Sequence, residues 1–309
     1  EIAQCLVGSE MCIRDSSWND QIGKDFTYSV GANLAYNHNE VGSIPTEDGI
    51  IHGATNQIYS NAEEFYRAEN GHAIGYFWGF KTAGIFQNKQ EINDWIAAGN
   101  GVYQSSVQPG DVKYVDVNHD GVIDAKDKVD LGNGLPKYTF GFNINLGYKG
   151  FDLSLNATGA AGFQIAQSYR DPNSSQSNYS RQILNRWTGE GTSNRIPRVT
   201  YGDVGNWQFS DLYLQDGDYI RLQNITLGYD FKRLISWKGL SKLRLYVQAQ
   251  NLFTLTKYDG MDPEIGSYNG TDGNKQNSDG TTNQTWVSGV DMGYYPHPRT
   301  FIVGINLAF

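Results

Sequence analysis

The strongest constraint on the fold of this chain is a strict alternation of side chains in the stretch YTFGFNINLGYK, residues 138–149. One face of an extended strand would carry the apolar residues Tyr138, Phe140, Phe142, Ile144, Leu146 and Tyr148. The other face would carry Thr139, Gly141, Asn143, Asn145, Gly147 and Lys149. Because successive side chains of a strand point to opposite faces, the stretch predicts one strand of about 40 Å. Strands of soluble sheets are usually shorter.

The same alternation recurs along the chain. Lys149 and Gly150 predict a two-residue turn, after which the phase inverts in FDLSLNATGAAGFQIAQ, residues 151–167. Alternation is clear again at 243–256 and 299–309, and weaker versions occur near 22–36, 72–87 and 219–231. We therefore expect an all-β chain with about seven strands, several of them longer than the usual five or six residues of soluble sheets.

Two architectures would produce this pattern. A soluble sandwich places its apolar face inward, whereas a transmembrane barrel places it outward, toward lipid. The barrel is favoured by strand length and by unequal connections, since a two-residue turn contrasts with long segments at 168–218 and 257–297. It is also favoured by aromatic residues near strand ends, although aromatic residues favour strands in general: Tyr138, Tyr148, Phe151, Tyr229, Phe231 and Phe253.

Composition agrees with β structure and limits the function. Aromatic residues make up 13% of the chain and charged residues only 18%. No uninterrupted apolar segment of about 18 residues is present and the mean hydropathy is −0.51, which excludes a membrane-spanning helix but leaves a barrel open. The net charge of −9 argues against nucleic acid as a partner, because nucleic acid requires a basic face.

The first sixteen residues, EIAQCLVGSEMCIRDS, differ from the rest of the chain. They hold the only two cysteines, Cys5 and Cys12, and they lack both β alternation and the residue order of a signal peptide. They resemble a tail that recurs on unrelated chains translated from metagenomic assemblies. We expect residues 1–16 to be a non-native tail with few contacts to the sheet; a genuine, cropped loop is the alternative.

Residues 116–127, DVNHDGVIDAKD, have the spacing of a calcium loop of the EF-hand type. Oxygen ligands would come from Asp116, Asn118, Asp120, the Val122 carbonyl, Asp124 and Asp127. Gly121 stands where such a loop turns sharply, and the closing residue is Asp rather than Glu, which predicts modest affinity. Because no flanking helices are evident, we expect a structural Ca²⁺ clamp rather than a sensor. An Asx-rich turn without metal is the alternative.

Catalytic motifs are lacking, and we expect the protein not to be an enzyme. There is no G-x-S-x-G or H-E-x-x-H sequence, and the five histidines are scattered. Aromatic residues in the long loops could stack on a sugar, with packing inside the loops as the alternative role: Trp187, Tyr201, Trp207 and Trp286.

Five segments together resemble one protein family. They are GDVKYVDVNHDGVIDAKDKVDLGNGLPKYTFGFN at 110–143, NRWTGEGTSNRIPR at 185–198, GDYIRLQNITLGYDF at 217–231, LRLYVQAQNLFTLTKYDGMDPE at 243–264 and YYPHPRTFIVGINLAF at 294–309. These stretches are similar to the C-terminal barrel of the SusC/RagA family of TonB-dependent outer-membrane transporters of Bacteroidetes. GINLAF also resembles a barrel-assembly signal, with Gly304, Leu307 and the terminal aromatic Phe309.

The resemblance implies a location in the outer membrane and a plugged barrel of about 22 strands. Residues 17–309 would be the C-terminal portion of that barrel, incomplete and carrying long extracellular loops. The resemblance further implies import of oligosaccharides or peptides. The partners would be a SusD-like surface lipoprotein, TonB through a missing N-terminal part, the barrel-assembly machinery and outer-membrane lipid. The alternative is a secreted or surface β-sheet protein that binds glycans through a calcium-ordered loop.

Overall fold

The computed structural model describes residues 6–53, 55, 58–59, 62–168, 178–200, 204–265, 267–276 and 282–309. Side chains are described throughout these ranges except at 6–10, 267–276 and 282–287.

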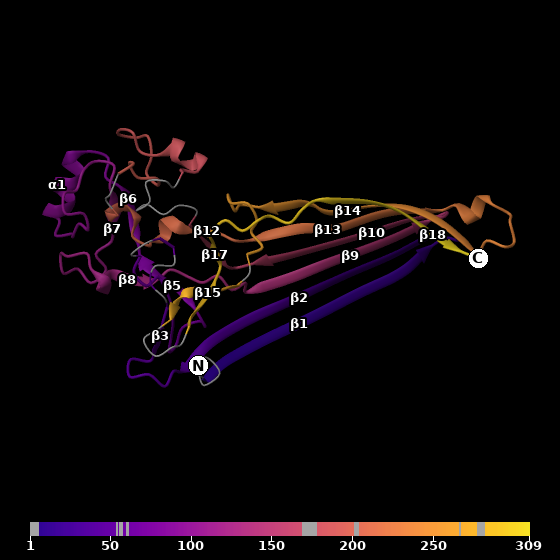
Figure 1. The fold of residues 1–309 in the computed structure, drawn as a ribbon, viewed down its shortest axis with the longest axis horizontal. Coiled ribbons are helices and arrows are strands. Elements are labelled where there is room, and N and C mark those ends of the chain that lie inside the picture. The colour runs from indigo at the N-terminus through magenta and orange to yellow at the C-terminus, as the bar shows by residue number, and fades with distance from the viewer. Residues whose placement is uncertain are drawn as a thin grey trace.

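Seven long strands form one antiparallel sheet in the order β1-β2-β9-β10-β13-β14-β18 (Figure 1). Their bounds are β1 Leu6–Ile22, β2 Phe26–Ser43, β9 Tyr138–Tyr148, β10 Phe151–Ala161, β13 Tyr219–Asp230, β14 Lys242–Thr256 and β18 Thr300–Ala308. The expected all-β fold and the expected number of strands are confirmed. The described part of the chain contains one α-helix, α1 Lys89–Ala97, and none of its helices is long and apolar enough to cross a membrane.

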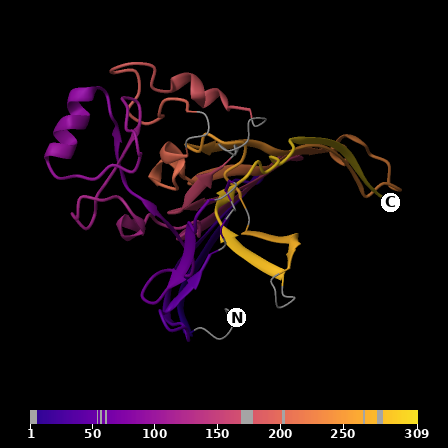
Figure 2. The ribbon, with the colours of Figure 1, turned by 60° about the vertical axis from the view of Figure 1, so that its left-hand side comes forward.

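The remaining strands, most of them short, form a second region at one end of the sheet, which we call the loop layer (Figure 1). They are β3 Ile50–His52, β4 Tyr66–Glu69, β5 Tyr76–Phe80, β6 Thr82–Ile85, β7 Val112–Tyr114, β8 Lys128–Asp130, β11 Gln164–Gln167, β12 Leu214–Asp216, β15 Ser267–Gln276, β16 Thr282–Ser288 and β17 Val290–Asp291. Short 3-10 turns lie at Ala125–Asp127, Arg181–Asn185, Gly205–Trp207, Asp211–Tyr213 and Phe231–Leu234. Figure 2 shows the β15–β16 hairpin standing away from the sheet.

The connections between the long strands are strongly unequal, as expected. At one end of the sheet they are short, at 23–25, 149–150 and 231–241. Lys149 (φ 47°) and Gly150 (φ 91°) both adopt the left-handed conformation that a tight two-residue hairpin requires. At the other end the connections at 44–137, 162–218 and 257–299 build the loop layer.

The sheet has one apolar and one polar face. Strand pairing aligns side chains of the same kind in rows that run across the strands. One row across six strands is entirely apolar: Val30, Ile144, Leu155, Ile225, Ala249 and Phe301. The adjacent row on the opposite face is Gly31, Asn143, Asn156, Asn224, Gln250 and Thr300.

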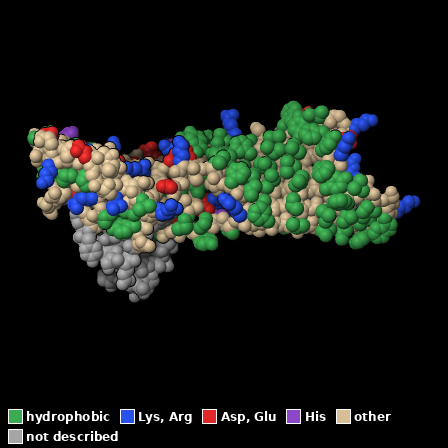
Figure 3. Space-filling view, turned by 90° about the horizontal axis from the view of Figure 1, so that it is seen from above, with side chains coloured by type: hydrophobic (Ala, Val, Ile, Leu, Met, Phe, Trp, Pro, Cys, Tyr) green, Lys and Arg blue, Asp and Glu red, His purple; other side chains and the backbone are tan. Residues whose placement is uncertain are grey.

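The apolar face is the exposed one. Phe142 is 43% exposed, Val303 80% and Phe301 73%. Figure 3 shows apolar side chains covering much of the sheet on the part of the molecule away from the loop layer. A soluble protein rarely leaves so large an apolar surface uncovered. The face therefore has the character of a surface that meets lipid, and the inward-facing sandwich is excluded.

The buried core lies in the loop layer. Its main cluster includes Phe65, Tyr66, Phe77, Phe209 and Leu214. The expectation that the weak alternation near 72–87 marks one strand of this sheet is wrong, because the segment forms two short strands, β5 and β6, within the loop layer. Four of the five residues of β5 are buried, so this strand packs on both faces and belongs to a core.

The expectation that residues 1–16 make few contacts with the sheet is wrong for residues 6–16. Strand β1 pairs with β2 from Leu6 opposite Ser43 to Ile22 opposite Phe26. An extended segment joined to β2 by a tight turn satisfies the free N–H and C=O groups of that edge, whatever its side chains. The register sets Arg14 opposite Leu34, on the apolar face. The non-native origin of the segment stays a prediction. Of its two cysteines, Cys12 is exposed and Cys5 lies outside the described residues.

Arg221 of β13 fastens the loop layer to the sheet. Its guanidinium forms ion pairs with Asp262 and with Glu264, the latter at 2.7 Å, and its Nε donates to the Thr254 hydroxyl at 3.0 Å. Asp262 also accepts from the backbone N–H of His297 at 3.1 Å. Burial raises the pKa of Asp262, but hydrogen bonds from the N–H groups of Glu264 and His297, the His297 ring and Arg221 outweigh this and hold the pKa below its ordinary value. One buried arginine thus fixes the segments after β14 and before β18.

The two faces of β9 predict opposite responses to a charge. We expect Phe142→Arg to impair assembly of the full-length protein, at a cost of about 2–4 kcal/mol for a site near the bilayer midplane, because the arginine would face lipid. Asn143→Arg is the matched control. The Asn143 side chain lies over Gly31 on the polar face, where an arginine would not meet lipid. Heat-modifiable gel mobility measures assembly; the reverse order of sensitivity would show that the apolar face is packed inward.

The Arg221 clamp predicts a local loss of order. Arg221→Met leaves Asp262 buried without its cation, which costs about 3–5 kcal/mol in comparable buried pairs. Limited proteolysis of the full-length protein should then cleave at 257–265 much faster, while the exposed Arg299→Met control leaves cleavage unchanged. Equal protection of both variants would refute the clamp.

Candidate ligand pocket and acidic loop

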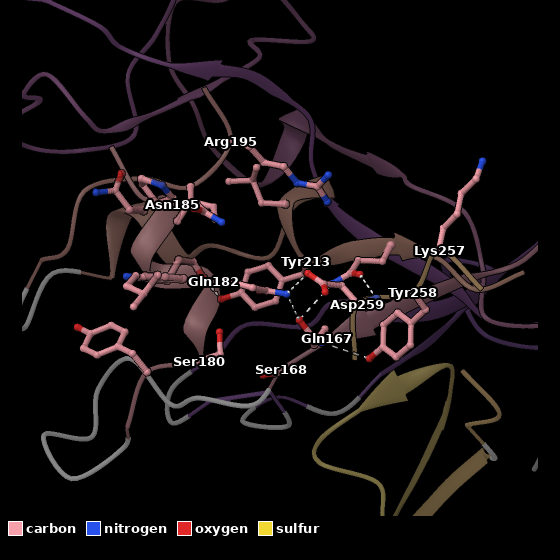
Figure 4. Close-up of a pocket in the computed structure, with 18 of the residues that line it drawn as sticks. Gln167, Ser168, Ser180, Gln182, Asn185, Arg195, Tyr213, Lys257, Tyr258 and Asp259 are labelled. Carbon is pink, nitrogen blue, oxygen red and sulfur yellow. Dashed lines mark hydrogen bonds between the residues drawn. The ribbon is translucent and has the colours of Figure 1, made fainter. Parts of the chain in front are cut away.

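The loop layer encloses a cavity of about 660 Å³ (Figure 4). Its walls come from β11, β12, the turn at Arg181–Asn185, the segment 195–197, residues near Trp207, and residues 256–259 after β14. The volume lies within the range of about 300–1,000 Å³ that is usual for small-molecule sites. Segments far apart in the sequence therefore converge on one space of ligand size.

Three glutamines and one aspartate form a hydrogen-bonded network along one wall. Gln167 and Gln215 lie on the same face of the β11–β12 pair, and the Gln215 amide donates to Gln167 Oε1 at 3.1 Å. The Gln182 amide donates to Asp259 Oδ2 at 2.8 Å and to Gln167 Oε1 at 3.4 Å. The Asp259 N–H donates to Gln215 Oε1 at 3.0 Å. The network fixes both the donors and the acceptors of this wall (Figure 4).

Aromatic and basic side chains complete the cavity. Trp207, Tyr213 and Tyr258 line it, and Tyr213 donates its hydroxyl to the Trp207 carbonyl at 2.9 Å. Arg195 and Lys257, both exposed, also line it, and the Arg195 guanidinium donates to the Leu214 carbonyl at 3.5 Å. The lining combines apolar rings with groups of both charges.

Two of the four aromatic residues predicted to contact substrate have described side chains, and only one of these two lines the cavity. Trp207 lines the cavity. Trp187 packs elsewhere: its ring N–H donates to Gln87 Oε1 at 3.3 Å, and its N–H donates to the Ile196 carbonyl at 2.8 Å. Trp286 belongs to β16, where side chains are not described, and Tyr201 lies outside the described residues. The glutamines were missed by sequence reasoning, because no spacing distinguishes them from other polar loop residues.

The acidic loop folds through hydrogen bonds from backbone N–H groups to its side chains. Asp116 Oδ2 accepts from the Gly121 N–H at 2.7 Å, across the turn that Gly121 (φ +82°) permits. Asp120 Oδ1 accepts from the Val122 N–H at 2.9 Å, and Asn118 Oδ1 accepts from the Asp120 N–H at 2.9 Å. The expected sharp turn around Gly121 is present.

The end of the loop is held in the same way. Asp127 is fully buried and accepts from the Val117 N–H at 2.8 Å and from the Asp124 N–H at 2.9 Å. Asp124 in turn caps the 3-10 turn that follows it. The second oxygen of Asp116, Oδ1, is buried and has no hydrogen-bond partner among the described residues.

The loop carboxylates do not converge on one point. Within the described residues, one set of three acidic or histidine side chains has ligand atoms that all lie within 4.8 Å of one another: Asp262, Glu264 and His297. The Arg221 guanidinium already supplies positive charge to the two carboxylates of this set. In the loop 116–127 the carboxylates bond to backbone N–H groups instead, so Ca²⁺ ligation would require side-chain rotation.

Two residues of the predicted assembly signal, Gly304 and Leu307, lie on β18, and Phe309 directly follows this strand. Gly304 lies beneath the Tyr246 ring, which comes within 2.3 Å of where a Cβ would stand. Leu307 (56% exposed) and Phe309 (81% exposed) are both largely uncovered. The role of these residues as a signal stays a prediction.

Comparison of the sequence with known proteins finds TonB-dependent receptors. The chain is 30% identical to TonB-dependent receptor P3 of Formosa agariphila over 305 residues, which is 98% of this chain and 28% of that protein. It is 27% identical to TonB-dependent receptor SusC of Bacteroides thetaiotaomicron, over 93% of this chain and 25% of SusC. The chain thus spans between a quarter and three tenths of the length of these relatives. No family model matches.

Solved structures show the same fold. The RagAB peptide importer in its closed-closed state matches with a TM-score of 0.68 at 20% identity, over 98% of this chain and 30% of the compared chain. The open-open state matches with a TM-score of 0.67 at 19% identity, over 99% of this chain and 29% of the compared chain.

The sheet, its outward apolar face and its unequal connections agree with these matches. The fold is part of a large antiparallel transmembrane β-barrel, and the outer membrane is its location. The chain belongs to the SusC/RagA family of TonB-dependent receptors.

Proposed function

We propose that the full-length protein imports oligosaccharides or peptides across the outer membrane, with this chain as part of its barrel wall. The observation that supports this most is the similarity of nearly the whole chain to TonB-dependent receptors, SusC among them. Because the chain shares its fold with part of the RagAB peptide importer, we include peptides as the second substrate class.

The two faces of the sheet suit such a wall. The apolar rows would contact lipid, and the asparagine-rich row would face the lumen. The loop layer would stand at the outer end, where a SusD-like lipoprotein acts as a lid. TonB would act on a part of the protein outside this chain. The exposed apolar face argues against the alternative of a soluble or peripheral glycan-binding protein.

Energy-dependent uptake tests the proposal. Cells that lack the full-length protein should lose uptake of fluorescent oligosaccharides or peptides, and a wild-type copy should restore it. Dissipating the proton gradient should abolish uptake while surface binding persists. We expect the purified protein to leave both substrate classes chemically intact, as a non-enzymatic transporter would. Uptake that is unaffected by the deletion, or a protein that salt washes from membranes, would refute the proposal.

We further propose that residues 116–127 bind Ca²⁺ as a structural clamp. The supporting features are the oxygen ligands available from Asp and Asn side chains, the Gly121 turn and the buried, unpartnered Oδ1 of Asp116. Four carboxylates within twelve residues repel one another, and a cation would convert this repulsion into ligation. The clamp would hold the loop against β8, which begins directly after it.

A calcium titration of the full-length protein tests the clamp. Asp120→Ala should abolish the calorimetric heat of Ca²⁺ binding and speed proteolysis at 110–130, while barrel assembly is unchanged. Asp94→Ala on α1 also removes an exposed acid and should change neither quantity. If wild-type protein shows no heat at millimolar Ca²⁺ and a chelator leaves cleavage unchanged, the loop is an acidic turn only.

A further inference from the structure

We propose that the loop-layer cavity is a binding subsite for a neutral sugar unit of the transported ligand, with Gln182, Asp259 and Trp207 as its contact residues. This inference rests on the proposed import function and names one class of substrate for it.

The polar side chains of the cavity wall are held in place by hydrogen bonds to one another. Gln167 and Gln215 are held by the β11–β12 ladder. Gln182 lies in the connection between β11 and β12, and Asp259 lies in the segment after β14. Each of the four side chains bonds to another member of the group or to its backbone. Such mutual bonding fixes side chains before a ligand arrives and lowers the entropic cost of binding.

The chemistry of this wall fits hydroxyl groups. A sugar hydroxyl both donates and accepts a hydrogen bond, so it requires donors and acceptors side by side. The Gln182 amide N–H groups are directed to Asp259 Oδ2 at 2.8 Å and Gln167 Oε1 at 3.4 Å, which leaves Gln182 Oε1 as an acceptor for a sugar hydroxyl. Arg195 and Lys257, which line the same cavity, supply N–H donors. Asp259 Oδ1 accepts from no residue in the described ranges and is available as an acceptor.

The charges of the cavity favour a neutral ligand. Asp259 would repel an anion, while Arg195 and Lys257 would repel a cation. An extended peptide would instead require a strand edge to pair with. The outer strands of the local sheet, β12 (Leu214–Asp216) and β17 (Val290–Asp291), are only three and two residues long.

The aromatic side chains that line the cavity also fit a sugar unit. The face of a sugar ring is apolar and packs on aromatic rings, while its hydroxyls require polar partners at the edge. Trp207 and Tyr213 line the same cavity as the amide wall. A sugar unit in this space would therefore meet apolar rings and hydrogen-bonding groups together.

Arg221 acts on this cavity as a positioning residue. It holds Asp262, which follows Asp259 by three positions, against β13. The contact wall of the cavity is thus tied to a strand of the barrel.

The test uses the purified full-length protein and a panel of neutral gluco-, xylo-, manno- and galacto-oligosaccharides. Uronate oligosaccharides and a tryptic peptide pool are the competing probes. We expect tryptophan fluorescence to report binding of at least one neutral oligosaccharide, with the signal reduced in Trp207→Phe. Gln182→Ala and Asp259→Asn should each weaken that binding at least tenfold.

The helix α1 offers a matched control pair. Gln90 donates to Asp94 Oδ1 at 2.8 Å, the same kind of bond as that of Gln182 to Asp259, but both residues are exposed on the helix and do not line the cavity. Gln90→Ala and Asp94→Asn should leave affinity unchanged. Heat-modifiable mobility confirms that all variants are assembled.

The outcomes separate the subsite from the proposed import function. Binding of only peptides or uronates, no binding by any neutral probe, or neutral binding that Gln182→Ala and Asp259→Asn leave intact would overturn the subsite. Each of these results could occur in a protein that still shows energy-dependent uptake. Loss of the import function is detected by the uptake assay alone, whatever the cavity binds.

Discussion

The backbone ladder of the seven-stranded sheet is the constraint on which the rest of the structure depends. Lipid offers no partner to a backbone N–H or C=O group, so a membrane-spanning strand must satisfy these groups through its neighbours. The ladder then assigns every side chain to one of two faces. The apolar row through Val30, Ile144 and Leu155 and the polar row through Gly31, Asn143 and Asn156 are direct results of that register.

The loop layer follows from the same sheet. Because the turns at one end are tight, almost all of the remaining chain gathers at the other end. There the molecule forms a conventional buried core and a cavity, and Arg221 fastens this region to β13. A wall that is rigid in the membrane thereby carries an irregular surface on which a ligand can be bound.

The sequence predicts the sheet well and the loop layer poorly, for physical reasons. A period of two is imposed by lipid on one side and by the lumen on the other, so the alternation at 138–149 correctly predicts β9. The segment 72–87 was assigned to the wrong sheet, because the apolar run of β5, which is buried on both faces, has the same composition as a strand of the large sheet. Residues 6–16 gave the opposite error, since pairing at a sheet edge needs only backbone groups. In the cavity, Gln182 and Asp259 are 77 positions apart, and no local pattern brings them together.

Spin-label accessibility along β9 tests the central claim most directly. Nitroxides would be placed singly at residues 139–147 of the full-length protein in bilayers, with any cysteines of that protein replaced by serine. Line broadening by molecular oxygen, which concentrates in lipid, should peak at positions 140, 142, 144 and 146. Broadening by a water-soluble nickel complex should be greatest at 141, 143 and 145. An accessibility profile with no period of two, or with the two reagents exchanged, would contradict an outward apolar face.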